Sequence, residues 1–430
     1  MWAQPVVWLP RELTRIYGPL LAELRDALAP RLPRGDVPLL LHPQAPAAHR
    51  RLATAYGQGA LPGVRATPTS SYRSVLAWRG ERKPVVLKLS IGAIIGRIRR
   101  ALREDQIARG VVMTAVLETI PPSHRAELGL DWFADVGGLV ETHSGYGWLL
   151  RKLPRTVTDS DDRWLLPMFS AISPQDDGPP PLVDLIRRSG RPATDYVLET
   201  LIRPYVGALS YLLFVQGIQV EGHSQNLLLE MDERDDPTGR VVLRDFSDAT
   251  VSIPLRIARR KPLPLLGSGL PAHGAPFPLA CVAADYKSNF SRPTLYRGAD
   301  TVERYGLSGM VWPLNTSLAR YFKGYDVRRI ERTYLALWQE ESVRFLGVKP
   351  LRHKGSKGIA TDEALAYYLR HQDWESHGAT NGHSLPEGVE PFLIERRARK
   401  RSRPVYQRLE CAWGDIFLLD GLPVFFRPGF

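Results

Sequence analysis

The chain has 430 residues, of which 44% are hydrophobic and 24% charged, as in ordinary folded proteins of two or three domains. Its two cysteines, Cys281 and Cys411, exclude a disulfide framework, and no CxxC pair is present to bind zinc. The N-terminus lacks the basic and apolar regions of a signal peptide, and no run of about eighteen apolar residues predicts a membrane span, so we expect a cytoplasmic protein.

The net charge of +12 leaves three kinds of partner to consider. No nucleic-acid recognition motif is present, and no basic amphipathic helix suits a membrane surface, so we expect neither partner. Basic residues around a cleft would instead attract a small anionic substrate.

The first 120 residues are predicted to alternate helices with strands. Apolar and charged residues recur at helical spacing over residues 11–32, which predicts a helix, and "DVPLLL" at 36–41 predicts a short strand. Residues 71–79 and 85–91 read as two strands joined by the turn "GERKP". A helix with a basic start is predicted over residues 94–118.

A long apolar helix is predicted over residues 193–216, after a loop rich in Pro, Asp and Ser, and Gly217 suits its C-terminal end. A β-hairpin should follow at once. Its strands are "NLLLEMD" and "RVVLRDF", and the polar run "ERDDPTG" between them is typical of a turn.

The last third of the chain begins with a segment rich in Pro and Gly, residues 257–280, which we interpret as a domain boundary. Helices are predicted beyond it, at about 315–346 and 361–371. The chain ends in a hairpin that turns at Asp420-Gly421. The sequence therefore predicts two domains, residues 1–260 and residues 261–430.

The predicted hairpin would bring polar residues at its two ends together. His223, Gln225 and Asn226 precede its first strand, and Asp245 ends its second. Asn226 and Asp245 offer the oxygen ligands that Mg²⁺ prefers, and Glu221 would stand beside the metal. The alternative is that these residues only cap a helix and a turn.

Three upstream features are suited to phosphate. Residues 67–75, "TPTSSYRSV", place hydroxyl groups and an arginine ahead of a strand. Lys88 lies in a strand beside a hairpin, like the nucleotide-binding lysine of protein kinases. Arg97, Arg99 and Arg100 fall at the start of a predicted helix, where a bound anion would offset their unfavourable position. Each group could instead face solvent.

The order of these features is similar to that of protein kinases, so a kinase-like phosphotransferase is one candidate. The loop from His223 to Asn226 nevertheless lacks the aspartate that would accept a proton from a substrate hydroxyl. A carboxylate nucleophile needs no such base, because it is already ionised at pH 7. Chemistry on a carboxylate therefore fits the loop better.

The chain resembles the siderophore synthetases that work without a nonribosomal peptide synthetase, of the aerobactin-synthetase type. That family carries a Ser-x-Arg-Thr element, Lys-Leu, an Arg twelve residues after that Lys, Glu-x-His-x-Gln-Asn and a later Arg-Asp. The matching residues are Ser71 to Ser74, Lys88-Leu89, Arg100, Glu221 to Asn226 and Arg244-Asp245, with His42-Pro43 upstream. Ser74 stands where the family has Thr. The resemblance covers roughly residues 38–250.

The resemblance implies an α+β fold, with a palm domain that carries the nucleotide on an antiparallel sheet and a more helical, thumb-like domain. It implies that ATP adenylates a carboxylate of citrate or a related polycarboxylic acid, and that an amine or alcohol then attacks the acyl-adenylate. The implied site comprises Ser71, Arg73, Ser74, Lys88 and Arg100 at the ATP phosphates, with Arg100 also at the carboxylate, His223 and Gln225 orienting the α-phosphate and the carboxylate, Asn226 and Asp245 holding Mg²⁺, and Glu221 orienting His223.

Two alternatives to this ligase stay open at the level of sequence. One is the kinase-like phosphotransferase, which would release ADP. The other is a non-catalytic member of the family, because relatives commonly carry an N-terminal region that has no counterpart here. The sequence names neither the acid nor the nucleophile, and it leaves a homodimer open.

Overall fold

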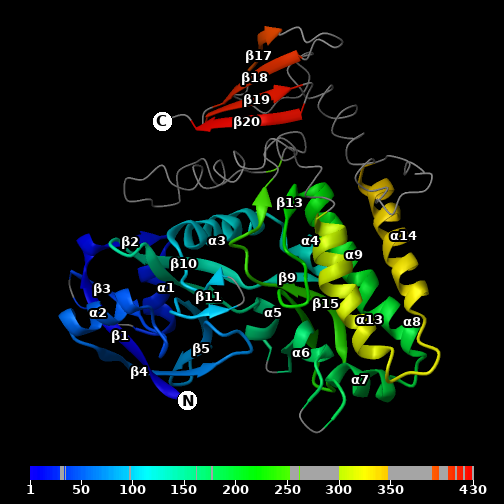
Figure 1. Ribbon diagram of the computed structural model, residues 1–430, viewed down its shortest axis with the longest axis horizontal. Coiled ribbons are helices and arrows are strands. Elements are labelled where there is room, and N and C mark those ends of the chain that lie inside the picture. Colours follow the sequence, from blue (N-terminus) through cyan, green and yellow to red (C-terminus); the bar gives the residue numbers. More distant parts are fainter. Residues whose placement is uncertain are drawn as a thin grey trace.

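Two β-sheets and a group of long helices form most of the protein (Figure 1). The computed structural model describes residues 1–29, 33, 35–95, 98–160, 162–175, 178–251, 261, 300–346, 390–396, 405–411, 414–419 and 422–428. The fold class is α+β, as predicted.

The larger sheet has eight strands in the order β2-β10-β11-β6-β5-β4-β1-β3, and each neighbouring pair is antiparallel. Its strands are β1 (Trp2–Pro10), β2 (Thr14–Tyr17), β3 (Asp36–Leu40), β4 (Gly59–Pro68), β5 (Ser74–Arg79), β6 (Val85–Leu89), β10 (Ala134–Glu141) and β11 (Tyr146–Lys152).

This sheet is strongly curled. In a flat sheet, β1 and β2 would lie about 29 Å apart, because six strand spacings separate them. Only η1 (Arg11–Leu13) joins them, and that link spans at most about 14 Å. The edge strand β3 therefore comes back towards β11, where the Trp148 Nε1 donates a hydrogen bond to the Pro38 carbonyl at 3.0 Å.

Helices cover this sheet at close range. They are α1 (Leu20–Ala27), α2 (Ala47–Tyr56) and α3 (Glu104–Leu117). A β-carbon on Gly137 would lie 2.7 Å from the Leu20 Cα, and one on Gly138 would overlap Ile107. These two glycines of β10 therefore allow α1 and α3 to pack directly on the strand.

The second sheet has the order β12-β14-β15-β9 and contains the predicted hairpin. Its strands are β9 (Leu130–Trp132), β12 (Trp164–Pro167), β14 (Leu227–Met231) and β15 (Pro237–Leu243), and only β9 and β15 are parallel. Leu227 pairs with Leu243, and the Arg244 amide donates to the Asn226 carbonyl at 3.0 Å. The predicted hairpin is confirmed, and its two ends are adjacent.

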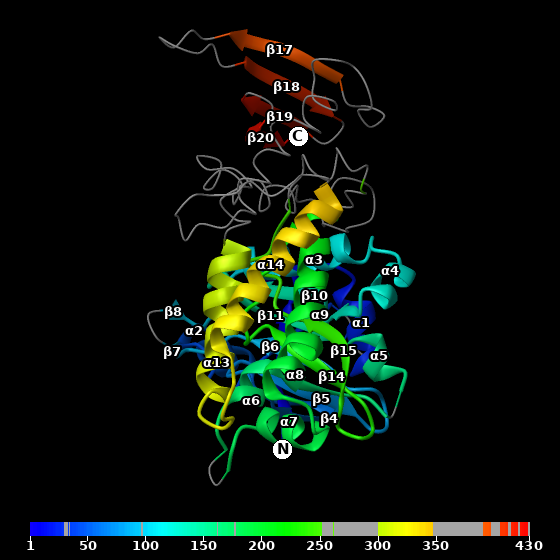
Figure 2. The ribbon, with the colours of Figure 1, turned by 90° about the vertical axis from the view of Figure 1, so that its right-hand side faces the viewer.

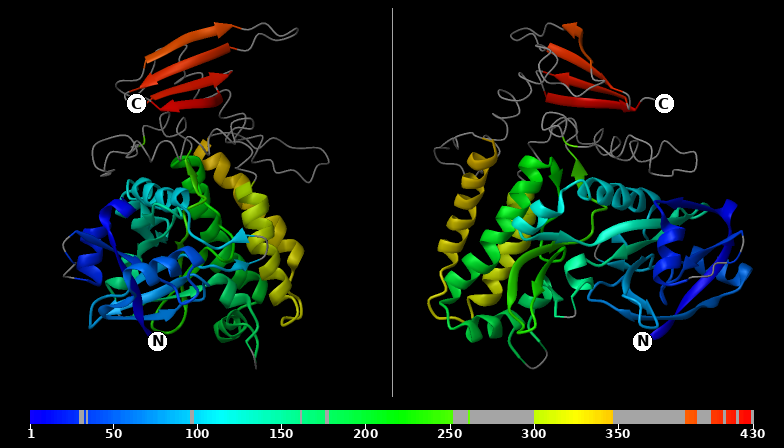
Figure 3. Two further views of the ribbon diagram at one scale, coloured as in Figure 1. Left: turned by 60° about the vertical axis from the view of Figure 1, so that its left-hand side comes forward. Right: turned by 180° about the vertical axis from the view of Figure 1, so that it is seen from behind.

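A layer of helices packs on the second sheet, on the side of the molecule away from β1–β4 (Figures 2 and 3). Trp338, Tyr334 and Phe214 are among the largest side chains buried in this layer. Its elements are α7 (Pro181–Ser189), α8 (Ala193–Val197), η2 (Leu198–Ile202), α9 (Arg203–Ser210), η3 (Tyr211–Val215), η4 (Asp300–Val311), α13 (Trp312–Leu318) and α14 (Val327–Leu346).

The run from α8 to η3 is a single long helix, Ala193–Val215, and it confirms the apolar helix predicted there. Its length and composition would allow it to cross a membrane, but 72% of its most apolar window is buried inside the protein. Its apolar side chains therefore pack in the core between the second sheet and α14. Gly217 follows with a φ of 60°, as expected of a helix-ending glycine.

Smaller elements complete the described chain. They are α4 (Pro122–Glu127), α5 (Arg155–Thr158), α6 (Met168–Ile172), the two-stranded pairs β7 (Ile94–Ile95) with β8 (Ile98–Arg99) and β13 (Ile218–Gln219) with β16 (Thr250–Val251), and a four-stranded antiparallel sheet of β17 (Glu390–Arg396), β18 (Val405–Cys411), β19 (Gly414–Leu419) and β20 (Leu422–Pro428). The pairing of β19 with β20 confirms the terminal hairpin.

Two predicted helices are wrong in part. Within the described part of residues 11–32, η1 and α1 are helical but β2 lies between them, because Gly18 adopts a φ of 64° and Pro19 starts the helix anew. Within residues 94–118, the first part forms the β7–β8 pair and the helix begins only at Glu104. The helix predicted at 361–371 lies outside the described residues, and the domain division at residue 260 stays a prediction.

Candidate functional site

A cavity of about 270 Å³ opens between the two sheets. Ser71 and Ser74 line it from the start of β5, and Gln225, Asn226 and Asp245 line it from the two ends of the hairpin. Five residues predicted from separate motifs therefore face one space.

The apolar part of the cavity comes from both sheets. Leu76 and Val86 of the large sheet meet Phe133, which directly follows β9, and Leu228 of the second sheet there. Apolar walls with a few polar groups at one end are typical of small-ligand sites. This part is suited to a flat aromatic base, with the polar part left for attached phosphates.

The turn before β5 is fixed by its own hydrogen bonds. The Thr69 hydroxyl donates to the Ser74 carbonyl at 2.9 Å and accepts from the Ser71 amide at 3.1 Å. The Ser74 amide donates to the Ser71 carbonyl at 3.1 Å. Both serines are thus held at the cavity wall without help from a ligand.

Lys88 lies on β6 directly opposite Ser74 of β5, and its side chain is 2% exposed. Its ammonium group forms an ion pair with the Asp245 carboxylate, so β6 and the end of the hairpin are tied together. Burial lowers the pKa of Lys88 to about 8, although the charge of Asp245 opposes that shift.

Asp245 is held at the cavity by several cations. Burial by itself would raise the pKa of its carboxyl group, but Lys88, Arg151 and Arg73 lower it well below the usual range. The Ser247 hydroxyl also donates to its carboxylate at 3.0 Å. Asp245 has a φ of 68°, a left-handed conformation in which aspartate and asparagine are tolerated better than most residues.

Arg73 and Arg100 lie side by side near this ion pair. The Arg73 guanidinium donates to the Arg100 carbonyl at 3.4 Å, and burial lowers the pKa of Arg73. Arg100 follows β8 and is outside any helix, so the helix-start argument for its position is wrong. The Nε atom of Arg100 is buried and has no hydrogen-bond partner among the described residues.

The choice of Arg100 over its neighbours stays a prediction, since Arg97 and the side chain of Arg99 lie outside the described part of the chain. The predicted His42-Pro43 element does reach the loop that precedes Arg100. The Gln44 amide donates to the His42 Nδ1 at 3.0 Å, and the Gly92 amide donates to the Gln44 carbonyl at 2.8 Å.

Glu221 and His223 form a cluster with Asn226 and with Tyr305 of η4. The His223 Nε2 lies 3.7 Å from the Glu221 carboxylate and 3.4 Å from the Asn226 amide nitrogen. The rings of His223 and Tyr305 are 6.2 Å apart. Burial would raise the pKa of Glu221, but hydrogen bonds from His223 and Tyr305 lower it overall.

Sequence reasoning missed Arg151, Asp135 and Tyr305. Arg151 lines the cavity and is bonded to Asp135, and both are almost wholly buried. Arg151 is a charged residue inside the apolar run "WLLRKL", which is the one signal in the sequence that could have singled it out. Tyr305 follows a long segment with no motif, so only the tertiary structure brings it to His223.

The residues fit Mg²⁺ as part of a complex with a nucleotide. No cluster of three or more His, Cys, Asp or Glu side chains able to hold a metal occurs in the described part of the chain. Asp245 and Asn226 line the cavity and could supply two oxygen ligands, and Mg²⁺ commonly takes its remaining ligands from phosphate and water. Because Asp245 is already paired with Lys88, it would hold bare Mg²⁺ weakly.

Solved structures with a similar fold include two aerobactin synthetases and a petrobactin biosynthesis protein. The aerobactin synthetase IucC from a hypervirulent pathotype of Klebsiella pneumoniae matches with a TM-score of 0.57 and 17% identity, over 85% of this chain and 70% of that one. ATP-bound IucA from the same pathotype matches at 0.55 and 14%, over 86% and 65%. The petrobactin biosynthesis protein AsbB from Bacillus anthracis str. Sterne matches at 0.61 and 13%, over 86% and 63%.

The resemblance that the motifs predicted is thereby confirmed at the level of the fold. The chain spans about two thirds of the length of these synthetases. No protein-family model and no curated protein matches the sequence.

Proposed function

We propose that the protein is an ATP-dependent synthetase of siderophore biosynthesis, of the type that needs no nonribosomal peptide synthetase, and that it works in the cytoplasm. It adenylates a carboxylate of citrate or a related polycarboxylic acid and joins it to an amine or alcohol. The observation that carries this proposal is the cavity where Ser71, Ser74, Asn226 and Asp245 meet on a fold shared with siderophore synthetases.

ATP would enter between the two sheets. Its base would occupy the apolar part of the cavity, and its phosphates would lie towards Ser71, Arg73 and Lys88. One protein with this fold, aerobactin synthetase IucA, has been solved with ATP bound, which supports a nucleotide here as well. Bound Mg²⁺ would neutralise phosphate charge, and Asn226 and Asp245 are the residues placed to hold it.

The carboxylate would attack the α-phosphorus of ATP, so that a carboxylate oxygen–phosphorus bond forms and pyrophosphate leaves. Arg100 is assigned to the carboxylate because its guanidinium has a buried nitrogen without a partner among the described residues. His223 and Gln225 would orient the reacting groups, and Glu221 would fix the imidazole of His223. The amine or alcohol then attacks the acyl carbon, and AMP leaves.

The test is product analysis with ATP and a panel of carboxylates, each with and without an amine or alcohol acceptor. We expect AMP and pyrophosphate to appear in equal amounts, with citrate or a related polycarboxylate the most active. Release of ADP would support the kinase-like phosphotransferase instead. The absence of turnover with every pair, in a protein that still binds ATP, would support a non-catalytic relative.

A further inference from the structure

Arg151 and Asp135 form a buried ion pair directly behind Asp245. The Arg151 Nε donates to one Asp135 oxygen at 2.5 Å and its Nη2 donates to the other at 3.1 Å. Asp135 is completely buried, and the side chain of Arg151 is 4% exposed. The same Nη2 lies 3.9 Å from the Asp245 carboxylate, close enough for a small shift to make a direct bond.

Helix α3 fixes Asp135 from behind. The Asp135 amide donates to the Thr114 hydroxyl at 2.7 Å. Gly110 lies against the carboxylate, and a β-carbon there would come within 2.6 Å of the Asp135 Oδ2. The carboxylate of Asp135 is therefore held in one place by a helix that does not itself line the cavity.

The charges around Asp245 explain why it matters that Asp135 holds the Arg151 guanidinium in place. Lys88 already pairs with Asp245, and the Arg151 guanidinium would be a second direct cation if Asp135 did not hold it. A carboxylate bonded to two buried cations is a poor ligand for a divalent metal, because the metal must displace them. Two charge-assisted bonds to Asp135 keep the guanidinium turned away from Asp245.

We infer that Asp135 is a positioning residue for the nucleotide–metal site: it restrains Arg151 and so keeps the Asp245 carboxylate available to a divalent cation bound with ATP. This inference rests on the proposed function, because it assumes that Asp245 is a ligand of the metal–nucleotide complex. It assigns a role to two residues that carry no motif in the sequence.

The test measures binding of Mn²⁺, as a spectroscopic substitute for Mg²⁺, by electron paramagnetic resonance with a non-hydrolysable ATP analogue. Asp135→Asn keeps the side-chain shape but removes the charge that restrains Arg151. We expect it to weaken Mn²⁺ binding about 10- to 100-fold, the usual effect of losing a residue that orients a metal ligand. In the double variant Asp135→Asn/Arg151→Met, the competing cation is gone, and we expect most of the affinity to return.

The double variant distinguishes a positioning role of Asp135 from a general contribution of Asp135 to the stability of the fold. A general structural role for Asp135 predicts that the double variant binds Mn²⁺ no better than Asp135→Asn, and this result would overturn the inference. Replacing both charges of a buried pair is often neutral for stability, so we expect the double variant to fold. Asp131→Asn is the matched control, since Asp131 is a buried aspartate bonded to the Trp132 amide at 2.8 Å and does not line the cavity.

A further variant, Arg151→Lys, serves if Asp135→Asn does not fold. Its ammonium group can still pair with Asp135 but is shorter than the guanidinium, so we expect Mn²⁺ binding close to that of the wild type. Weakening as large as that expected for Asp135→Asn would overturn the inference. If the wild-type protein binds neither ATP nor Mn²⁺, the proposed function itself fails and the inference falls with it.

Discussion

At the scale of single residues, Lys88 should make ATP binding depend on pH. Burial lowers the pKa of Lys88 to about 8, so the ammonium group, which we propose to meet the phosphates, is charged below this pH and neutral above it. The charged fraction falls about tenfold for each pH unit above the pKa. We therefore expect the affinity for a non-hydrolysable ATP analogue, measured by calorimetry, to fall as the pH rises from about 8 to about 9.5.

Two variants control this pH profile. Lys88→Met should bind the analogue weakly at every pH, with a flat profile over the same range. Lys83→Ala removes an exposed lysine from the same β-hairpin, where it pairs with Asp159 at 3.1 Å, and should leave the wild-type profile unchanged. An affinity of the wild type that stays constant over the whole range would remove Lys88 from the phosphate site.

The Asp245→Asn variant tests the metal assignment. Asparagine keeps the shape and accepts the left-handed backbone, but its neutral amide is a weaker ligand for Mg²⁺. We expect pyrophosphate release to need a much higher Mg²⁺ concentration than in the wild type. Asp232→Asn changes the far end of the same hairpin and should leave the Mg²⁺ profile as it is.

The Asp245→Asn variant also leaves Lys88 and Arg151 without their shared counter-charge. The melting temperature of this variant should therefore fall whether Asp245 binds Mg²⁺ or is only a structural partner. The Mg²⁺ titration therefore decides the question, and the melting curve does not. A variant with reduced stability and a normal Mg²⁺ profile would show that Asp245 is only a structural partner of these cations.

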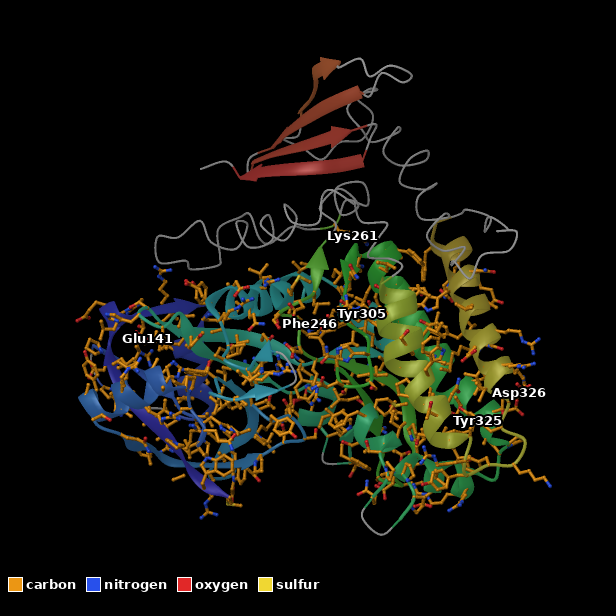
Figure 4. The ribbon with its side chains drawn as sticks, in the orientation of Figure 1. Glu141, Phe246, Lys261, Tyr305, Tyr325 and Asp326 are labelled. Carbon is orange, nitrogen blue, oxygen red and sulfur yellow. The ribbon has the colours of Figure 1, made fainter. Side chains whose placement is uncertain are left out.

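At the scale of elements, helix η4 brings Tyr305 to the site from beyond residue 300 (Figure 4). Tyr305→Phe removes the hydrogen bond that helps to lower the pKa of Glu221 but keeps the ring. A hydrogen bond to a charged group contributes about 1.5–3 kcal/mol. We expect a lower kcat for pyrophosphate release and little change in ATP affinity, since Tyr305 lies beside His223 and is not among the residues that line the cavity between the sheets.

Tyr325→Phe is the matched control for Tyr305→Phe. Tyr325 donates to the Asn315 side chain at 2.9 Å, and Figure 4 places it at the far end of α13 from Tyr305. Its loss should lower the melting temperature and leave kcat unchanged. Equal effects of the two variants on kcat would mean that η4 acts only through general stability.

The sequence predicted those elements whose pattern is local. The hairpin of β14 and β15 was predicted because its turn residues and apolar runs are contiguous. The strand β2 was missed because "RELTRIYG" has helical spacing, and its strand conformation depends on pairing with β10. Such pairing joins residues more than a hundred positions apart, which no local pattern records.

At the scale of the whole molecule, ATP should stabilise both sheets together, because the cavity is lined by both. A ligand at a hundred times its dissociation constant stabilises the folded state by about 2.7 kcal/mol. We expect Mg²⁺·ATP to raise the melting temperature and to slow amide hydrogen exchange in β5, in β6 and in the loop from Glu221 to Asn226. Protection confined to one of the two sheets would contradict a ligand held between them.

The candidate site was predictable only in part, for a reason that belongs to the whole molecule. Ser71, Lys88, Asn226 and Asp245 could be proposed because short motifs carry them in a recognisable order. Arg151 and Asp135 could not, since a buried charge on β11 gains meaning only from the carboxylate that β10 places beside it and from the cavity in front. The ion pair of Arg151 and Asp135 beside the cavity is thus a property of the assembled sheets.

During synthesis on the ribosome, β1 to β6 emerge long before β10 and β11, which complete the sheet. At the usual rate of translation, β2 waits on the order of ten seconds for its partner, which lies about 120 residues later. Over much of that interval β6, the strand that bears Lys88, is an open edge with unpaired backbone groups. The nascent chain therefore exposes the strand that bears Lys88 to chaperones, and to other nascent chains, before β10 and β11 complete the sheet.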